Sequence, residues 1–314
     1  MKNSTEKVRD AFSGFHPLVG FLYFVFVIGF GMFFLHPYAL ACSLIGSFAY
    51  SIWLNGKKAV RFNFIALLPM LAIMALVNPA FNHEGATILY YLGSGNPITL
   101  ESIYYGIASA TMLVCAVCWF SCYNTVMSSD KLIYLFGRII PSLSLLLAMT
   151  MRFVPRFKEQ IKKIADAQRC LGKDVSSGSV IRRVQQGLTI LSVMMTWALE
   201  NSIETSDSMK SRGYGLPDRS SFSIYKIDKR DKSALIYLLT ASLYILIGAW
   251  NKGLYYRYFP TLRMATGIYT ASILTAYLLL ALFPIGANIL QNIRWNNIYQ
   301  GEEKIAATDQ FAPR

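Results

Sequence analysis

The sequence predicts an all-α protein that crosses a membrane about six times and carries a large helical insert on the cytoplasmic side. Of its 314 residues, 54% are apolar and only 15% are charged, whereas soluble domains carry about 25% charge. The net charge is +13, which fits basic cytoplasmic loops better than a nucleic-acid-binding surface in so apolar a chain. Because 14% of the residues are aromatic, intrinsic disorder is excluded as well.

Six apolar runs approach the length of about 20 residues that a membrane span requires. They cover residues 18–35, 38–54, 62–79, 103–123, 234–250 and 264–290. Pro284 and Gly286 lie within the last run. Because proline removes a helical hydrogen-bond donor, we expect the last span to kink or end there.

The distribution of basic residues predicts the orientation of these spans. The N-terminus and the loop over residues 55–61 are basic, whereas the loop over residues 80–102 has no lysine or arginine and contains Glu84 and Glu101. We therefore expect both chain ends in the cytoplasm. The loop over residues 251–263 should then be external although it is basic, so its topology stays open.

Three regions follow from this pattern. Residues 1–127 form an N-terminal membrane region with four spans, and residues 233–314 form a C-terminal membrane region with two spans and a cytoplasmic tail. The cytoplasmic region between them, residues 128–232, holds 18 of the 30 basic residues and 10 of the 17 acidic ones. Whether its apolar beginning, residues 132–151, lies in or on the membrane stays open.

Two long helices are expected in the middle region. The first should start near Pro141, bend at Pro155 and stop at Gly172. Its second half carries an apolar stripe, which is formed by Phe157, Ile161, Ile164, Gln168 and Leu171. The second helix should run over residues 180–212, about 50 Å, because apolar residues recur there at three- and four-residue steps.

Each of these helices ends in an arginine close to a glycine. Arg169 precedes Gly172, and Arg212 precedes Gly213. A basic residue in a last turn is common, since it complements the helix dipole. The repetition on two amphipathic helices of one insert is a more specific signal.

These features resemble the transmembrane T component of energy-coupling factor (ECF) transporters, the family that includes the cobalt- and nickel-transport membrane subunits. Residues 151–172 and 198–215, behind four N-terminal spans, carry the resemblance. In that family two coupling helices end in short triplets of the Ala-Arg-Gly type. The matching positions here keep the arginine but change some of the small flanking residues; they are Gln168, Arg169 and Cys170 in the first helix and Ser211, Arg212 and Gly213 in the second.

The resemblance implies a membrane scaffold between two cytosolic ABC ATPases and a small substrate-binding membrane protein, the S component. Arg169 would enter a groove on one ATPase and Arg212 a groove on the other, since a guanidinium offers a rigid fork of donors to a carboxylate or to carbonyl groups. ATP hydrolysis would belong to the partners, because the chain has no GxxxxGK[ST] loop. No catalytic residue and no cofactor is expected in this chain.

The second helix also predicts a surface for the S component. Its exposed apolar side chains would form a platform, and methionine suits a surface that exchanges partners because it repacks easily. The platform residues are Leu188, Leu191, Val193, Met194 and Met195. The imported substrate would be a micronutrient, a vitamin or a transition-metal ion, which the sequence of this subunit does not identify.

The sequence leaves two other functional classes open. A polytopic membrane enzyme should gather titratable groups in one cavity, and a non-transport membrane anchor would use the insert only for docking. Cys115, Cys118 and Cys122 share one face of the fourth span, but no fourth metal ligand accompanies them, so packing is the preferred interpretation. Likewise, His83, Glu84 and Glu101 have no ligand spacing that favours a metal site.

Overall fold

A computed structural model describes residues 10–91, 97–137, 141–174, 179–214, 225–265 and 267–310 of the chain. The chain forms two compact units. The membrane unit, as we call the first, combines Met1–Lys131 with Tyr225–Arg314, and the helical-pair unit is Leu132–Ile224.

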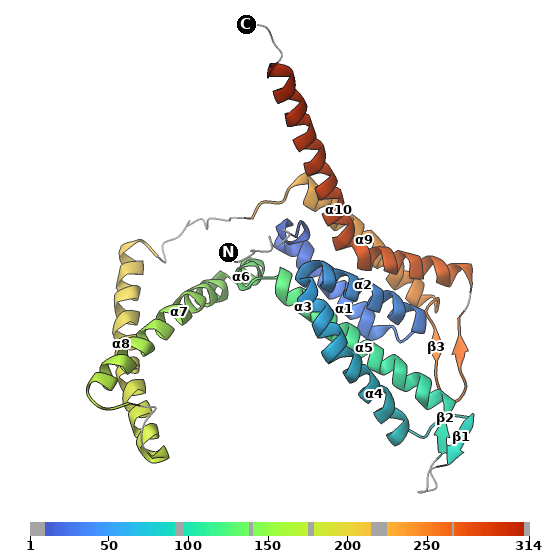
Figure 1. Cartoon of the computed structure of the whole chain (residues 1–314), viewed down its shortest axis with the longest axis horizontal. Coiled ribbons are helices and arrows are strands. Elements are labelled where there is room, and N and C mark those ends of the chain that lie inside the picture. The colour runs from blue at the N-terminus through green and yellow to red at the C-terminus, as the bar shows by residue number, and fades with distance from the viewer. Residues whose placement is uncertain are drawn as a thin grey trace. The chain divides into compact units, whose positions relative to one another are not determined.

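The membrane unit is almost entirely helical (Figure 1). Its helices before the helical-pair unit are η1 (Phe12–Gly14), α1 (Pro17–Phe33), α2 (Pro37–Asn55), α3 (Lys57–Phe62), η2 (Asn63–Leu67), α4 (Leu68–Phe81) and α5 (Leu100–Val126). The chain re-enters the unit with α9 (Lys229–Trp250) and α10 (Ile268–Gln310). Two short antiparallel hairpins complete it: β1 (Ile88–Tyr91) with β2 (Pro97–Thr99), and β3 (Tyr256–Arg257) with β4 (Arg263–Met264).

The helices confirm an all-α polytopic membrane protein. Within the described residues, five helices are long and apolar enough to cross a membrane. They are Pro37–Asn55, Lys57–Phe81, Leu100–Val126, Lys229–Trp250 and Ile268–Trp295. The first predicted span forms the shorter apolar helix α1, which has 17 residues. Each of the six predicted runs is thus helical, and five of them meet the length of a span.

The sequence predicts that the last span kinks or ends near Pro284 and Gly286, and the structure excludes the second outcome. Pro284 lies inside α10, and the helix continues to Gln310 instead of ending near Gly286. Figure 1 shows α10 changing direction along its length, which agrees with a kink. A proline interrupts one turn, but intact turns on both sides keep the helix going, and helices packed among other helices tolerate this loss.

The core of the membrane unit is aromatic. Trp119 of α5 is fully buried, lies 6.0 Å from Tyr23 between ring centroids, and donates its indole N–H to Ser43 Oγ of α2 at 3.0 Å. The helices approach closely where a small residue permits it: a Cβ on Gly46 of α2 would lie 2.7 Å from the Cβ of Ala281 of α10. Small residues at such crossings are typical of membrane helix packing.

The loops at one end of the membrane unit contact each other. The backbone N–H of Ala86 donates to the carbonyl of Pro260 at 3.1 Å, and Tyr258 donates to the carbonyl of Leu35 at 2.6 Å. The basic loop over residues 251–263 therefore lies at the same end of the membrane unit as the loop over residues 80–102.

At the opposite end of the membrane unit, residues in and next to η1 contact the first turns of α9 and of α6 (Ser129–Gly137). Asp231 in the first turn of α9 accepts the backbone N–H of His16 at 3.3 Å. Lys131 of α6 donates to the carbonyl of Ser13 at 2.7 Å. Burial lowers the pKa of the Lys131 ammonium, and the charge of Asp10 partly offsets this effect. We call this end of the membrane unit the η1 end.

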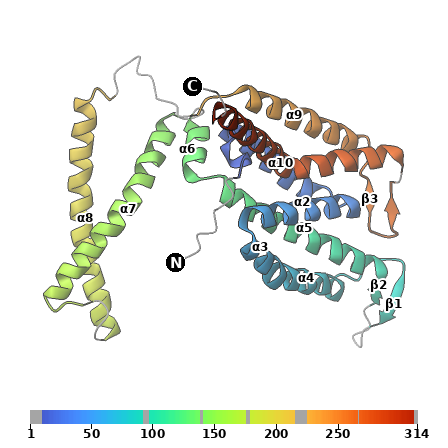
Figure 2. The same ribbon diagram turned by 45° about the horizontal axis from the view of Figure 1, so that its top comes forward.

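The helical-pair unit consists of two long crossed helices (Figure 2). Helix α7 (Pro141–Cys170) begins at the predicted proline, and α8 (Val180–Ser211) covers the predicted range to within one residue. Their contact is small: Ile164 of α7 packs on Ile190 and Met194 of α8, and Phe157 meets Trp197 edge-on with 5.5 Å between ring centroids.

Candidate functional site

The crossing sets the C-terminal ends of α7 and α8 on opposite sides of their contact. Phe157 pairs with Trp197, while Ile164, further along α7, packs on residues earlier in α8. The helices are therefore antiparallel at the crossing. At 1.5 Å per residue, the end of α8 lies about 27 Å beyond Met194, and the end of α7 about 10 Å beyond Ile164.

The end of α7 is a Schellman motif, a cap in which a residue with positive φ turns the chain out of the helix. Gly172 has φ +73°, which glycine adopts without steric cost. The N–H of Lys173 donates to the carbonyl of Gln168 at 3.0 Å, and the N–H of Gly172 to the carbonyl of Arg169 at 3.0 Å. The predicted stop at Gly172 is confirmed.

The end of α8 repeats this cap. Gly213 has φ +75°. The N–H of Tyr214 donates to the carbonyl of Met209 at 3.0 Å, and the N–H of Gly213 to that of Lys210 at 2.9 Å. Two helix ends that are far apart thus have the same backbone geometry.

This shared geometry gives a residue-by-residue register between the two ends. When the cap glycines are superposed in sequence, Arg212 corresponds to Leu171, and Arg169 corresponds to Lys210. Arg169 and Arg212, the central residues of the two triplets, therefore stand at different positions relative to their cap glycines. The family triplets align the two arginines with each other, whereas a position within a cap is counted back from the glycine, a count that the sequence already permits.

The side chains at the two ends also differ. Arg169 lies with its Nε 3.4 Å from Asp174 Oδ2, although 72% of its side chain is exposed. The Leu171 side chain is 70% exposed. Arg212 on α8 is exposed as well. The α7 end thus presents an apolar side chain where the α8 end presents a cation.

The remaining predicted triplet residues lie beside these side chains. Cys170 is exposed with a free thiol, and Ser211, its counterpart in the register, is exposed too. Gln168 is half-buried, and its Oε1 has no hydrogen-bond partner in the described structure. Gly213 is half-buried and makes the cap itself.

The predicted platform on α8 is divided by the crossing. Leu188, Leu191, Val193 and Met195 are exposed, whereas Met194 is 6% exposed and packs against α7. Met194 is therefore a contact between the two helices, and a partner would meet only the other four. Helix α7 buries one face of α8, and the opposite apolar face of α8 stays exposed.

The alternative site residues have structural surroundings. Cys115, Cys118 and Cys122 are buried in the helix packing of the membrane unit. Glu101 is 2% exposed and accepts the N–H of Thr87 at 3.2 Å and its hydroxyl at 2.8 Å. Across the described ranges, no three His, Cys, Asp or Glu side chains gather as a metal site.

Comparison with known proteins gives a family match and several relatives. The family described as CbiQ, cobalt transport protein, matches residues 14–224, a range that includes both helix ends. The chain is similar to the energy-coupling factor transporter transmembrane protein EcfT of Lacticaseibacillus paracasei, with 26% identity over 63% of this chain and 80% of the relative. The protein of the same name from Listeria innocua is 26% identical over 62% of this chain and 79% of the relative.

Shorter alignments show higher identity. The protein of that name from Lactobacillus helveticus is 32% identical over 32% of this chain and 36% of the relative. The one from Leuconostoc gelidum is 29% identical over 37% of this chain and 44% of the relative. The chain thus spans less than half the length of these two relatives.

Proposed function

The chain belongs to the CbiQ cobalt transport protein family as an energy-coupling factor T component, and we propose that it couples two cytosolic ABC ATPases to an S component. The cargo is a micronutrient, a vitamin or a transition-metal ion, and the S component selects it. The η1 end of the membrane unit faces the cytoplasm, and so do both chain termini. The chain hydrolyses no nucleotide itself.

The observation that carries this proposal is the pair of exposed caps on opposite sides of one helix crossing. Each cap is a narrow, glycine-ended tip with exposed side chains that a groove on another protein can enclose. A single antiparallel helix pair offers two such tips, one for each of the two ATPase subunits. Because the helices contact each other through Ile164, Ile190 and Met194, a displacement of one tip is passed to the other helix at that contact.

The coupling step follows from rigid-body movement of packed helices. ATP binding draws the two ATPases together and moves both tips. Helices α7 and α8 then change their crossing, and the exposed face of α8 moves with them. The S component rests on that face through Leu188, Leu191 and Met195, and it is reoriented to release its cargo.

The two tips offer a direct test through their matched thiol positions. Cys170 is the exposed cysteine of the chain, and Ser211 is its counterpart on α8. We would measure the rate of alkylation by a membrane-impermeant maleimide for Cys170, and for a thiol at the α8 tip in the double variant Cys170→Ser with Ser211→Cys. Inverted membrane vesicles with and without the co-expressed ATPases would be compared.

Both thiols should react at least several-fold more slowly when the ATPases are present. The control is Glu200→Cys in the Cys170→Ser background, because Glu200 is exposed and lies about 18 Å from Arg212 along α8. Its reactivity should change little. Equal reactivity of both tips with and without ATPases would refute ATPase docking at these ends.

A further inference from the structure

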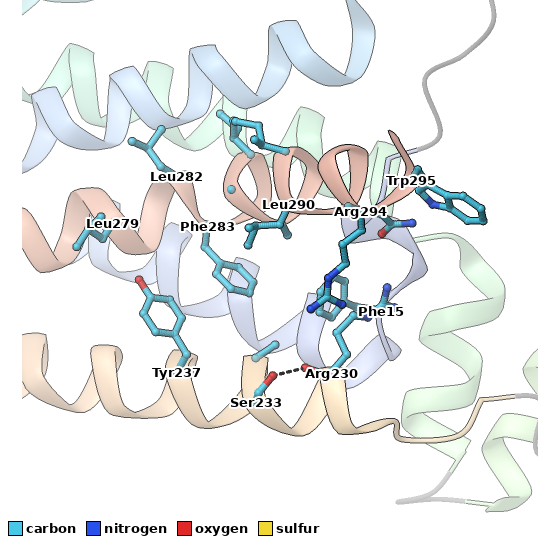
Figure 3. A pocket seen from close by; sticks show the side chains of 16 residues that line it. Phe15, Arg230, Ser233, Tyr237, Leu279, Leu282, Phe283, Leu290, Arg294 and Trp295 are labelled. Carbon is cyan, nitrogen blue, oxygen red and sulfur yellow. Dashed lines mark hydrogen bonds between the residues drawn. The ribbon is translucent and has the colours of Figure 1, made fainter. Parts of the chain in front are cut away.

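A cavity of about 830 Å³ lies in the membrane unit between α9 and α10 (Figure 3). Its walls come from Phe15 after η1, from the first three turns of α9, and from residues 279–295 of α10. Nearly all of it lies outside the residues 14–224 that match the family. Nothing in the coupling role described above requires it.

The cavity is apolar along its length and cationic at one end. Leucine, isoleucine and aromatic side chains line most of it, and Tyr237 of α9 stacks on Phe283 of α10 with 5.3 Å between ring centroids. Arg230 and Arg294 enter from the two helices at the η1 end. Figure 3 shows the Arg294 side chain reaching toward Arg230 beside Phe15.

The guanidinium of Arg230 is held in position. Its Nη2 donates to the carbonyl of Gly14 at 3.1 Å, and its Cζ lies 4.1 Å from the ring centroid of Phe15. These contacts use one donor and one face of a group with five donors. The remaining donors stay available to an anion in the cavity.

None of the described residues that line the cavity carries a carboxylate. The neighbouring Asp231 is 3% exposed, and its oxygens accept the backbone N–H groups of His16 and Asp228 at 3.3 Å and 3.2 Å. That carboxylate is occupied in the capping of α9. Within the described lining of the cavity the two arginines have no counter-charge, so they form a site for an anionic group, since guanidinium binds phosphate through charge-assisted hydrogen bonds.

The cavity has the length and the position expected of a site within one membrane leaflet. Arg294 and Trp295 end the apolar stretch Ile268–Trp295, at the depth where arginine and tryptophan meet lipid headgroups. From there to Leu279, the wall extends about 22 Å along α10. One leaflet of the hydrocarbon core is about 15 Å deep, so the apolar wall is long enough for an acyl chain.

We propose that this cavity binds one anionic phospholipid, with the phosphate at Arg230 and Arg294 and an acyl chain along α9 and α10. A soluble anion would use the arginines but leave the apolar wall uncovered. A helix of another protein would cover the wall but would have to bring a charge to match two arginines. A phospholipid satisfies both ends with one molecule that the membrane already contains.

The test is native mass spectrometry of the delipidated, detergent-purified chain titrated with phosphatidylglycerol or phosphatidylcholine. We expect one phosphatidylglycerol to bind on the order of ten-fold more tightly than phosphatidylcholine, because both lipids carry a phosphate but the trimethylammonium of phosphatidylcholine cancels its charge and is repelled by the two guanidinium groups. The double variant Arg230→Gln with Arg294→Gln should lose this preference. Lys58→Gln with Arg61→Gln removes the same charge from exposed positions on α3 and should keep it.

A second pair of variants tests the apolar wall. Gly286 lines the cavity, and a Cβ at this position would meet nothing within 4 Å. Gly286→Leu should therefore fold and fill the cavity, and phosphatidylglycerol should bind several-fold more weakly. Gly29 of α1 has the same open surroundings outside the cavity, so Gly29→Leu should leave binding unchanged.

Three outcomes would overturn the proposal. Equal binding of the two lipids, or a preference that survives in the arginine double variant, would mean an unselective lipid shell. Arginine-dependent binding of inorganic phosphate that Gly286→Leu leaves intact, without a lipid preference, would mean a free-anion site. A photo-crosslinking residue at Leu290 that captures a polypeptide instead of a lipid in native membranes would mean a protein interface.

Discussion

The ends of α7 and α8 share a backbone and differ in their side chains. Both turn out of the helix at a glycine, with φ +73° at Gly172 and +75° at Gly213, and both close with the same pair of hydrogen bonds. Yet Leu171 stands where the other end has Arg212. The glycine fixes the shape that a groove must accept, and the residue before it fixes the chemistry. If the two ends dock on ATPases as proposed, the two grooves should therefore differ as well.

The largest expected effect is the loss of Arg212. Arg212→Ala should weaken ATPase binding by about 2–5 kcal/mol if the guanidinium is desolvated in its groove, and coupled uptake should fall in parallel. Pull-down of each ATPase by the tagged chain measures the loss, with Lys210→Ala on the same tip as the control. If Arg169→Ala reduced binding as much as Arg212→Ala, the asymmetry between the two tips would be wrong.

The second effect concerns the apolar tip. Leu171→Ala should weaken the contact of α7 with its ATPase by about 1–3 kcal/mol, since burial of a leucine side chain contributes that much. The contact should also be insensitive to salt, in contrast to that of Arg212. Titration of ATPase binding at low and high ionic strength distinguishes the two tips. A salt-sensitive α7 contact would show that Arg169, and not Leu171, dominates there.

The third effect tests the shared backbone. Gly172→Ala and Gly213→Ala should each destabilise their helix end by about 1 kcal/mol, because alanine is strained at positive φ. Hydrogen exchange of the last-turn amides measures it, and the two losses should be equal. Gly187 of α8 is the control, because it is helical with open surroundings and Gly187→Ala should slow exchange instead. Unequal losses would mean that the two caps are not the same structure.

The smallest effect belongs to the ion pair at the α7 end. Asp174→Asn removes the partner of Arg169, which lies 3.4 Å away. Because the arginine is mostly exposed, the free energy of unfolding should fall by no more than about 0.5 kcal/mol, which thermal unfolding measures. The same variant should leave ATPase binding nearly unchanged. A large loss of binding would assign Asp174 a direct role in docking.

The sequence predicted those parts of the fold that local chemistry decides. Apolar runs predicted every membrane helix, and Pro141, Gly172 and Gly213 predicted helix limits, because proline and glycine constrain the backbone wherever they occur. The resemblance predicts the tip residues but not their register in the caps, because a triplet match does not count positions back from the glycine. Helical periodicity predicts Leu171 on the apolar stripe of the first helix, and the structure leaves its side chain 70% exposed.

Other features depend on contacts between distant segments. The basic loop over residues 251–263 could not be placed by its charge, because its position rests on a hydrogen bond between Ala86 and Pro260. Met194 was indistinguishable from Met195 until the crossing with α7 buried it. The cavity needs Arg230 and Arg294 from separate helices to converge, and no local pattern signals that convergence.

The unequal distances from the crossing to the two tips make the helix pair an asymmetric lever. The arm of α8 is about 27 Å and that of α7 about 10 Å. If the contact at Ile164 acts as the fulcrum, the same angular movement displaces Arg212 nearly three times as far as Leu171. Two ATPases that close by equal distances would then rotate the two helices by unequal angles. A symmetric closure of the ATPases would therefore tilt the helix pair in one direction.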